Sequence, residues 1–378
     1  LIGIISTTTI ILTFQFSAKQ TTVQSWLTDG YDSQMRLAKQ PDIRFRPGIG
    51  KHIQRITVDP GVKYQEMLGF GASLTDSAAY LIHEELNPSN YTLLMQNLFN
   101  ATSGIGLSYL RLPMGSSDCA LTWYTYDDTA PDLSDFSIAH DELYIIPLLL
   151  DALDINPDLK IVGSPFTAPG WMKFGNDLTD PSTKGMIGGR LKPSMHDLYA
   201  EYFVKFIQAY AAHDIDIDAV TLQNEPFHSP DDYPGMLMNV TQQIDFLIAL
   251  GTAFDDNNID TKILILDHNW DLADEALAVL SNSAARQYIS GVAWHGYSSP
   301  DPAAQSRVRD KYPTVGHYFT EVTGFNAAPY FHDNLAWLYE NVFVGSVRNW
   351  AKTVLLWNLA LNESGGPILR PYYDMRGV

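Results

Sequence analysis

Two glutamates could perform acid–base and nucleophilic chemistry, because each stands at the end of an apolar run. Glu225 lies in the run TLQNEP, where the following proline holds it out of helical geometry, and Glu321 ends the run YFTE. Hydrolysis of a β-glycoside with retention needs two carboxyl groups about 5–5.5 Å apart, one protonated and one ionised. Repulsion from an ionised Glu321 is expected to raise the pKa of Glu225, as a general acid requires. Taken singly, each glutamate has a simpler interpretation as a solvated or helix-capping residue.

From about Tyr64 onward, short apolar runs alternate with longer helical ones, which is typical of parallel strands joined by helices. The clearest helix is Asp197–Ala212, where apolar side chains recur every four residues from Leu198 to Tyr210. An α/β fold of the (β/α)8 TIM-barrel type follows, with the carboxyl ends of its strands at one mouth. A doubly wound open sheet is the alternative, but no strand is followed by a GxGxxG or P-loop pattern. The predicted strands are Met67–Ala72, Leu107–Pro113, Leu159–Pro165, Ala219–Asn224, Lys262–Asp267, Gly291–Tyr297, His317–Val322 and Thr353–Leu361.

The charge balance and the cysteine count exclude several classes of function. The net charge is −19, from 43 acidic and 24 basic residues, so nucleic acid would be repelled, and no Lys/Arg run offers an exception. The single cysteine, Cys119, allows no intrachain disulfide and no thiolate metal site. The 10 histidines form no HExxH motif and no close pair, so a metal is not expected. A double displacement needs only two carboxyl groups and water, so no other cofactor is expected.

Residues 1–18 carry no charge and are interpreted as the apolar part of a signal peptide that lacks its starting Met. A buried strand or a membrane anchor is the alternative. A signal would make the protein secreted or lysosomal. Residues 19–60 are expected to form an N-terminal β segment, with weak strand signals at Val23–Leu27 and Ile53–Val58. Residues 61–378 would form the barrel, incomplete at its C-terminus because no eighth helix follows the eighth strand. Candidate glycosylation sites are Asn90, Asn100, Asn239 and Asn362.

Seven runs surround the two glutamates in a fixed order. They are GFGASLTDSAAYL from Gly69, YLRLPMGSSD from Tyr109, SPFTAPGWMK from Ser164, TLQNEP, GVAWHGY from Gly291, FTE from Phe319 and LLWNLALNESGGP from Leu355. Together they resemble glycoside hydrolase family 30, the family of acid β-glucosidase (glucosylceramidase). The resemblance extends from about Gln20 to Pro367, and the ordered set is highly specific. It implies a barrel with a small β-rich side domain built from both chain ends, of which the N-terminal part would be present here.

The resemblance assigns roles position by position. It makes Glu225 the acid/base and Glu321 the nucleophile. Asp118 would hold sugar hydroxyls, and Arg111 would lie beneath the catalytic pair, where a fixed positive charge keeps a carboxylate ionised. The further substrate-binding residues that it implies are Phe166, Asn224, Tyr233, His295, Tyr297 and Trp357.

Simpler structural roles stay open for several of these residues when the family is set aside. Asp118 suits a loop cap, and Arg111 suits an ordinary buried ion pair. His295 suits a core residue with its hydrogen bonds satisfied. Trp357 suits the core as well, because tryptophan is usually mostly buried.

The sequence departs from the family pattern at four places. Phe166 stands where animal glucosylceramidases have tryptophan, so stacking survives but the indole donor is lost. Gly296 replaces a large aromatic residue and is expected to open the aglycone side. Thr323 occupies a position that is often cysteine. The run Ile368-Leu369-Arg370 lacks an expected asparagine, which removes one sugar contact.

The leading prediction is a retaining β-glucosidase that acts by double displacement on terminal β-glucosyl linkages, with glucosylceramide as the natural candidate substrate. A β-xylosidase or a β-1,6-glucanase would keep the mechanism and change the sugar. A non-catalytic or non-folding truncated remnant is the third interpretation. The presence of both Glu225 and Glu321 opposes a non-catalytic protein, whereas the missing C-terminal segment favours a chain that is unstable alone. The expected partners are a β-glucoside or glycosphingolipid and, peripherally, a lipid surface.

Overall fold

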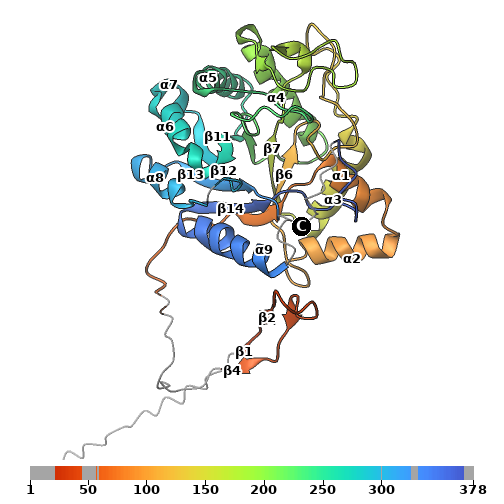
Figure 1. The fold of residues 1–378 in the computed structure, drawn as a ribbon, viewed down its shortest axis with the longest axis vertical. Coiled ribbons are helices and arrows are strands. Elements are labelled where there is room, and N and C mark those ends of the chain that lie inside the picture. The colour runs from red at the N-terminus through yellow and green to blue at the C-terminus, as the bar shows by residue number, and fades with distance from the viewer. Residues whose placement is uncertain (1–21, 45–56, 58, 299, 325–330, 370–378) are drawn as a thin grey trace, which may run out of the picture. The chain divides into compact units, whose positions relative to one another are not determined.

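The computed structural model describes residues 22–44, 57, 59–298, 300–324 and 331–369 (Figure 1). Contacts within the chain divide it into two units, residues 1–62 and 63–378. The signal-peptide prediction for residues 1–18 lies outside the described residues, as does nearly all of the strand signal at Ile53–Val58.

The first unit contains two short antiparallel pairs among its described residues. Strand β1 (Thr22–Val23) pairs with β4 (Ile43–Arg44), and β2 (Trp26–Leu27) pairs with β3 (Ala38–Lys39). The predicted strand signal at Val23–Leu27 therefore covers parts of two strands instead of one. With only two residues each, these strands bury little apolar surface.

In the second unit, the described residues form a ring of eight parallel strands. Backbone hydrogen bonds from Ser108 N to Phe70 O (3.0 Å) and from Leu74 N to Arg111 O (2.8 Å) join the first strand to the second and close the ring. Each predicted run overlaps one strand, so the (β/α)8 prediction is confirmed. Around the ring, the strands are β5 (Gly69–Ala72), β14 (Ala351–Leu356), β13 (Gly316–Glu321), β12 (Ile289–His295), β11 (Lys262–Asn269), β10 (Ala219–Thr221), β7 (Lys160–Ser164) and β6 (Tyr109–Pro113).

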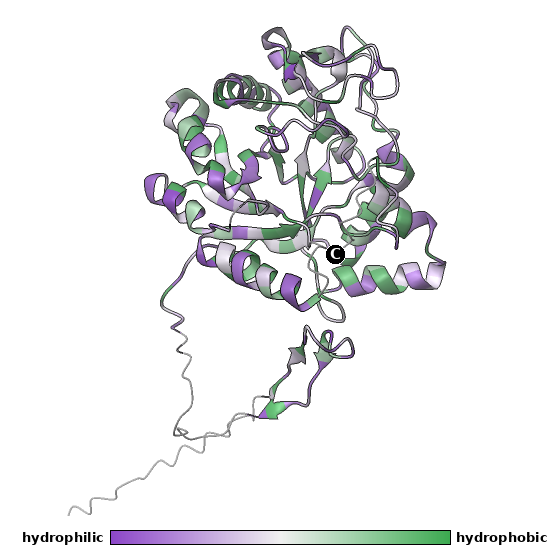
Figure 2. Cartoon of the chain, in the orientation of Figure 1, coloured by the Kyte–Doolittle hydropathy of each residue, from purple (hydrophilic) through white to green (hydrophobic). Residues whose placement is uncertain are grey.

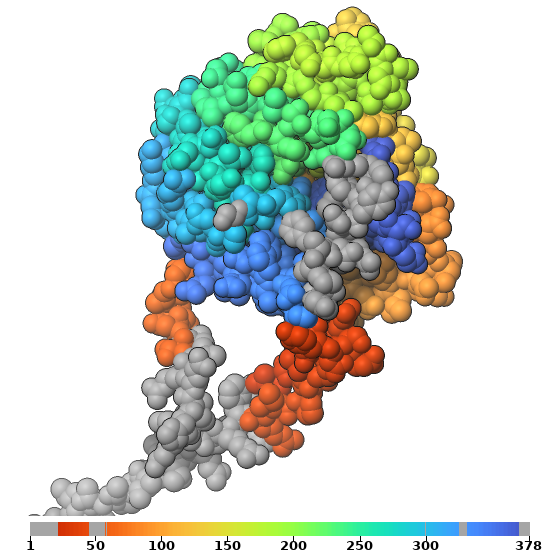
Figure 3. Space-filling view, viewed as in Figure 1, coloured from red at the N-terminus to blue at the C-terminus, as the bar shows by residue number. Residues whose placement is uncertain are grey.

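Helices connect successive strands and lie outside the ring (Figure 1), and Figure 3 shows the same view with all atoms drawn space-filling. The predicted helix Asp197–Ala212 is α4, displaced by one residue. Among the described residues, no helix has the length and apolar character needed to cross a membrane. The helices are α1 (Asp76–Glu84), α2 (Pro88–Phe99), α3 (Asp141–Ile155), α4 (His196–Ala211), α5 (Val240–Asp256), α6 (Ala273–Ser281), α7 (Ser283–Arg286), α8 (Ala303–Lys311) and α9 (Phe331–Trp337).

Shorter elements complete the described part of this unit. A hairpin of β8 (Lys173–Phe174) and β9 (Arg190–Leu191) follows the third barrel strand. Strand β14 is preceded by a π-helical segment, η4 (Leu338–Ser346). Three single 3-10 turns are η1 (Gly170–Met172), η2 (Pro193–Met195) and η3 (Trp270–Leu272).

Local sequence signals explain where the helices begin. At α5, the Asn239 side chain accepts a hydrogen bond from Gln242 N (3.0 Å), and the Gln242 side chain accepts one from Asn239 N (3.2 Å). This reciprocal capping satisfies two amide groups that the first turn leaves unpaired. The helices then pack apolar faces on the ring and turn polar faces outward, so that α2 and α9 carry both green and purple in Figure 2.

The interior of the ring changes from apolar to polar along its axis. A layer of apolar side chains fills its lower part: Tyr109, Val162, Ala219, Leu264, Ala293, Tyr318 and Leu355. Because side chains two residues apart on a strand share a face, the next inward layer is polar on most strands. It contains Arg111, Ser164, Thr221, His295 and Thr320, all buried. This polar layer is the floor on which the site is built.

Candidate active site

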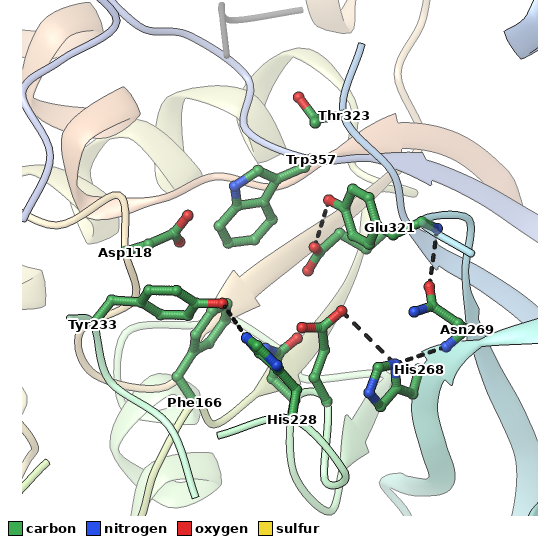
Figure 4. A pocket seen from close by; sticks show the side chains of 12 residues that line it. Asp118, Phe166, His228, Tyr233, His268, Asn269, Glu321, Thr323 and Trp357 are labelled. Carbon is green, nitrogen blue, oxygen red and sulfur yellow. Dashed lines mark hydrogen bonds and ion pairs between the residues drawn. The ribbon is translucent and has the colours of Figure 1, made fainter. Parts of the chain in front are cut away.

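A pocket of about 350 Å³ lies at the carboxyl ends of the strands (Figure 4). Eight of the ten predicted site residues line it. Arg111 and His295 do not line the pocket and lie fully buried beneath it. The lining residues are Asp118, Phe166, Asn224, Glu225, His228, Tyr233, His268, Asn269, Tyr297, Glu321, Thr323 and Trp357.

The two glutamates come together in the centre of this pocket. One carboxylate oxygen of Glu225, one of Glu321 and a ring nitrogen of His295 all lie within 4.8 Å of one another. Their side chains are 15% and 8% exposed, so both carboxyl groups can reach a substrate. Retaining glycosidases hold their carboxyl groups about 5–5.5 Å apart, whereas inverting ones need roughly 6.5–9.5 Å to admit a water molecule. The spacing suits retention.

Two donors fix Glu321. The buried Arg111 guanidinium donates from Nη1 to Oε2 at 2.6 Å, and the Tyr297 hydroxyl donates to Oε1 at 2.7 Å. Burial raises the pKa of Glu321, and the positive charges of His295 and Arg111 oppose that rise. Both hydrogen bonds favour the ionised form, which is the form a nucleophile needs.

Glu225 is held in a strained backbone conformation. Its φ of 45° lies in the left-handed region, and its N–H donates to Asp267 O at 3.0 Å. Non-glycine residues adopt this region at a cost of about 1–2 kcal/mol, and such strain concentrates at functional sites. His295 Nδ1 lies 3.1 Å from Glu225 Oε1.

The pKa expectation for Glu225 is wrong. Burial alone would raise the pKa of Glu225, but the hydrogen bond and positive charge of His295 lower it below its ordinary value. The effect of His295 on the pKa of Glu225 is therefore larger than that of the repulsion from Glu321. The pKa of His295 rises to about 9: burial lowers it, but the charges of Glu321 and Asp267 prevail. These opposite shifts favour a protonated His295 beside an ionised Glu225.

Asp267 organises the polar layer, and the sequence did not mark it as a site residue. Although burial disfavours its charge, Arg111 and His295 hold the pKa of Asp267 well below its usual range. The one signal was its place at the end of the fifth predicted strand. Its carboxylate accepts hydrogen bonds from Arg111 Nη2 (2.9 Å), Ser164 Oγ (2.7 Å), Thr221 Oγ1 (2.8 Å), Thr320 Oγ1 (2.7 Å) and His295 Nε2 (3.0 Å).

One side of the pocket is suited to a sugar ring. Phe166 and Trp357 lie with their ring centres 5.5 Å apart, and the Arg111 guanidinium sits near both rings. Burial and the charge of Glu321 raise the pKa of Asp118 to about 7, and its Oδ1 has no hydrogen-bond partner among the described residues. Asn224 Oδ1 accepts from Arg111 Nη2 at 2.7 Å, which leaves its amide hydrogens for a ligand.

Gly296 does not open the aglycone side, so that expectation is corrected. A Cβ atom at this position would lie 3.1 Å from Phe319 Cζ and 3.3 Å from Val322 Cγ2, among buried side chains beside the pocket. A larger residue here would crowd the core behind the strands. Thr323 does line the pocket. Ile368, where an asparagine was expected nearby, packs against the cluster that contains Phe166 and Trp357.

The other side of the pocket carries residues that sequence reasoning missed: His228, His268 and Asn269. Tyr233, which was predicted, packs against the cluster of Phe166 and Trp357 (Figure 4), and its hydroxyl lies 3.1 Å from His228 Nε2. His228 follows Glu225 by three residues, and its backbone N–H donates to Glu225 O at 2.8 Å. Their one signal was position, because all three lie within four residues of the end of a predicted strand.

Within the described residues, one group of three side chains could hold a metal ion: Glu225, His295 and Glu321. Both His295 nitrogens already contact carboxylates, at 3.1 Å (Glu225) and 3.0 Å (Asp267). Arg111 neutralises Glu321. The group is thus satisfied internally as a hydrogen-bonded network.

Comparisons with known proteins agree with this geometry. Residues 67–375 match the model of the glycosyl hydrolase family 30 TIM-barrel domain. The chain belongs to glycosyl hydrolase family 30. This agrees with the family resemblance that the ordered sequence runs carry.

Several members of family 30 are similar to this chain. An endo-1,6-beta-D-glucanase of Neurospora crassa is 32% identical over 325 residues, covering 83% of this chain and 65% of the relative. The lysosomal acid glucosylceramidase of Mus musculus is 32% identical over 338 residues, covering 82% and 63%. The solved structure of the endo-beta1,6-glucanase BT3312 superposes with a TM-score of 0.79 at 33% identity, covering 84% of this chain and 72% of that one. The chain thus spans less than two thirds of the length of both curated relatives.

Proposed function

We propose that this chain hydrolyses β-linked glucosyl units with retention, with Glu321 as nucleophile and Glu225 as acid/base. The observation that carries the proposal is the spacing of the two carboxyl groups, within 4.8 Å between their nearest ligand atoms. Glu321 attacks the anomeric carbon and forms a glycosyl-enzyme ester. Water then hydrolyses this ester with help from Glu225 acting as base.

The proton for the leaving group comes through His295. This residue holds a proton 3.1 Å from Glu225, and Asp267 on its other nitrogen fixes the ring. When a glycosidic oxygen comes to rest on Glu225, a proton moves from His295 to the carboxyl and on to the departing oxygen. Arg111 and Tyr297 keep Glu321 ionised meanwhile, because both donate to its oxygens.

The substrate we propose is a β-1,6-linked glucan. Relatives named as endo-1,6-beta-glucanases, from Neurospora crassa and in the BT3312 structure, support this choice. The polar character of the flank with His228, His268 and Asn269 supports it as well, since sugar hydroxyls can pair with such groups. Glucosylceramide is the second candidate, favoured by the mouse relative at 32% identity. Either substrate would place the protein outside the cell or in a lysosome.

Labelling with a 2-deoxy-2-fluoro-β-glucosyl fluoride tests the mechanism. The fluorine slows breakdown of the glycosyl-enzyme, so peptide mass spectrometry should find the adduct on Glu321. An adduct on another residue, or none on folded and active protein, would refute the assignment. Proton NMR of the first product should show the β-anomer, and the α-anomer would mean inversion. Product release from a β-1,6-glucan and from glucosylceramide, measured side by side, decides the substrate.

A further inference from the structure

Strand β11 ends in a bulge that redirects two side chains. Leu266 and Asp267 have φ of 72° and 47°, in the left-handed region that residues with a Cβ rarely adopt. The pairing of β11 with β12 shifts register between Leu266 and His268. Bulges re-aim side chains near active sites. Here Asp267 reaches the polar floor, and the next residue, His268, lines the pocket.

The hydrogen bonds of His268 define where its proton lies. Its Nδ1 accepts the backbone N–H of Asn269 at 2.9 Å, so in the neutral ring the proton is on Nε2. Burial lowers the pKa of His268 to about 4, which keeps the ring neutral above that pH. Within the described part of the chain, Nε2 makes no hydrogen bond. The neutral ring, which lines the pocket, therefore carries one N–H donor that has no partner among the described residues.

This donor lies on the leaving-group side. In Figure 4, Asp118, Phe166 and Trp357 lie on one side of Glu321, and His268 and Asn269 lie on the other. His268 Nδ1 is 3.8 Å from Glu225 Oε1, so the ring adjoins the carboxyl that must meet the glycosidic oxygen. Asn269 Oδ1 accepts a hydrogen bond from the backbone N–H of Tyr297 at 2.9 Å. The side-chain amide hydrogens of Asn269 therefore point away from that N–H.

We propose that His268, with Asn269, binds a hydroxyl of the sugar that leaves, and so selects a glycan over an apolar aglycone. The inference rests on the proposed function and names the leaving-group specificity of that site. A sugar hydroxyl pairs with the Nε2–H donor. A nitrophenyl or lipid group leaves the donor unpaired, and a desolvated donor without a partner weakens binding of that group in the transition state.

The test compares substrates that share one glycone and differ in the leaving group: β-1,6-linked gluco-oligosaccharides and the matching 4-nitrophenyl glycosides. In His268→Leu, kcat/KM for the oligosaccharide should fall about 10- to 100-fold further than for the nitrophenyl substrate. His268→Gln keeps an N–H donor of similar reach and should restore at least half of that difference on a logarithmic scale. His213→Leu is the matched control, because His213 pairs with Glu142 away from the pocket residues and is 33% exposed.

The outcomes separate the two claims. Equal loss on both substrates, or no recovery in His268→Gln, would mean that His268 only supports the fold or Glu225, and overturns the inference alone. Wild-type protein that is folded and hydrolyses neither substrate overturns the proposed function together with the inference. A larger loss on the nitrophenyl substrate would assign His268 to the opposite preference and overturn the inference as well.

Discussion

The hydroxyl of Tyr297 is the most direct point at which to test how the site keeps Glu321, the proposed nucleophile, ionised. Tyr297→Phe removes one oxygen, which donates to Glu321 Oε1 at 2.7 Å, and leaves Arg111 on Oε2 at 2.6 Å. Hydrogen bonds to charged groups contribute about 1.5–3 kcal/mol. At about 1.36 kcal/mol per factor of ten, kcat/KM should fall roughly 10- to 150-fold.

The pH profile gives the same substitution a second readout. The hydrogen bond stabilises the ionised carboxylate, so its loss raises the pKa of Glu321. The nucleophile must be ionised to attack, and the acidic limb of kcat/KM should therefore move to higher pH. Hydrolysis of a 4-nitrophenyl β-glucoside across pH 3–8 measures both effects.

A matched control is Tyr199→Phe, which removes another buried hydroxyl that has no hydrogen-bond partner among the described residues. This control should leave both the rate and the acidic limb in place. An acidic limb that stays at the same pH in Tyr297→Phe, with a rate within threefold of wild type, would show that Tyr297 does not govern the ionisation of Glu321.

Three further predictions test other parts of the molecule. Glu225→Gln should lower kcat/KM, which reports the first step, about 10²- to 10⁴-fold for a sugar leaving group but far less for 2,4-dinitrophenolate, which needs no proton; equal losses would exclude a general acid. Lys173→Met should lower the free energy of unfolding in urea by about 2 kcal/mol, because the buried amine lies within hydrogen-bond distance of Thr167 and of three backbone carbonyls; an unchanged midpoint would contradict this. Burial raises the pKa of Asp141 to about 6, above its value of 3.8 when unfolded, so it contributes stability below pH 4 that is lost as pH rises through 6. Asp141→Asn lacks this pH dependence. Between pH 4 and pH 7, the free energy of unfolding of the wild type in urea should therefore fall by up to about 3 kcal/mol relative to that of the variant. Equal changes in both proteins would refute the raised pKa of Asp141.

The strands and their order were predictable because buried parallel strands are short apolar runs with regular spacing. Glu225 and Glu321 could be found for a related reason, since the carboxyl ends of such strands converge. The polar floor could be found only in part. Arg111 lies two residues after Tyr109, so both side chains are on one face of the strand. This alternation is common to all strands and does not tell which face points into the barrel.

What the sequence could not reveal depends on backbone geometry that no periodicity encodes. The bulge at Leu266 and Asp267 adds a residue to the alternation, so strict counting from Leu264 would turn Asp267 away from the lumen. The expectation that the pKa of Glu225 is raised was wrong for a similar reason. This pKa depends on the contact with His295, which comes from a different strand, and charge balance over many residues outweighed the one repulsion that was considered.

The carboxylate of Asp267 has a consequence for how the barrel holds together. Through its five partners it joins six consecutive strands, from β6 to β13, across the lumen. Opening the ring between any two of these strands would therefore pull apart the floor that orients Glu225 and Glu321. Catalytic turnover is then a reporter of ring closure. During unfolding, activity should disappear in the same transition as the tryptophan signal of the ring, and no half-barrel fragment should retain it.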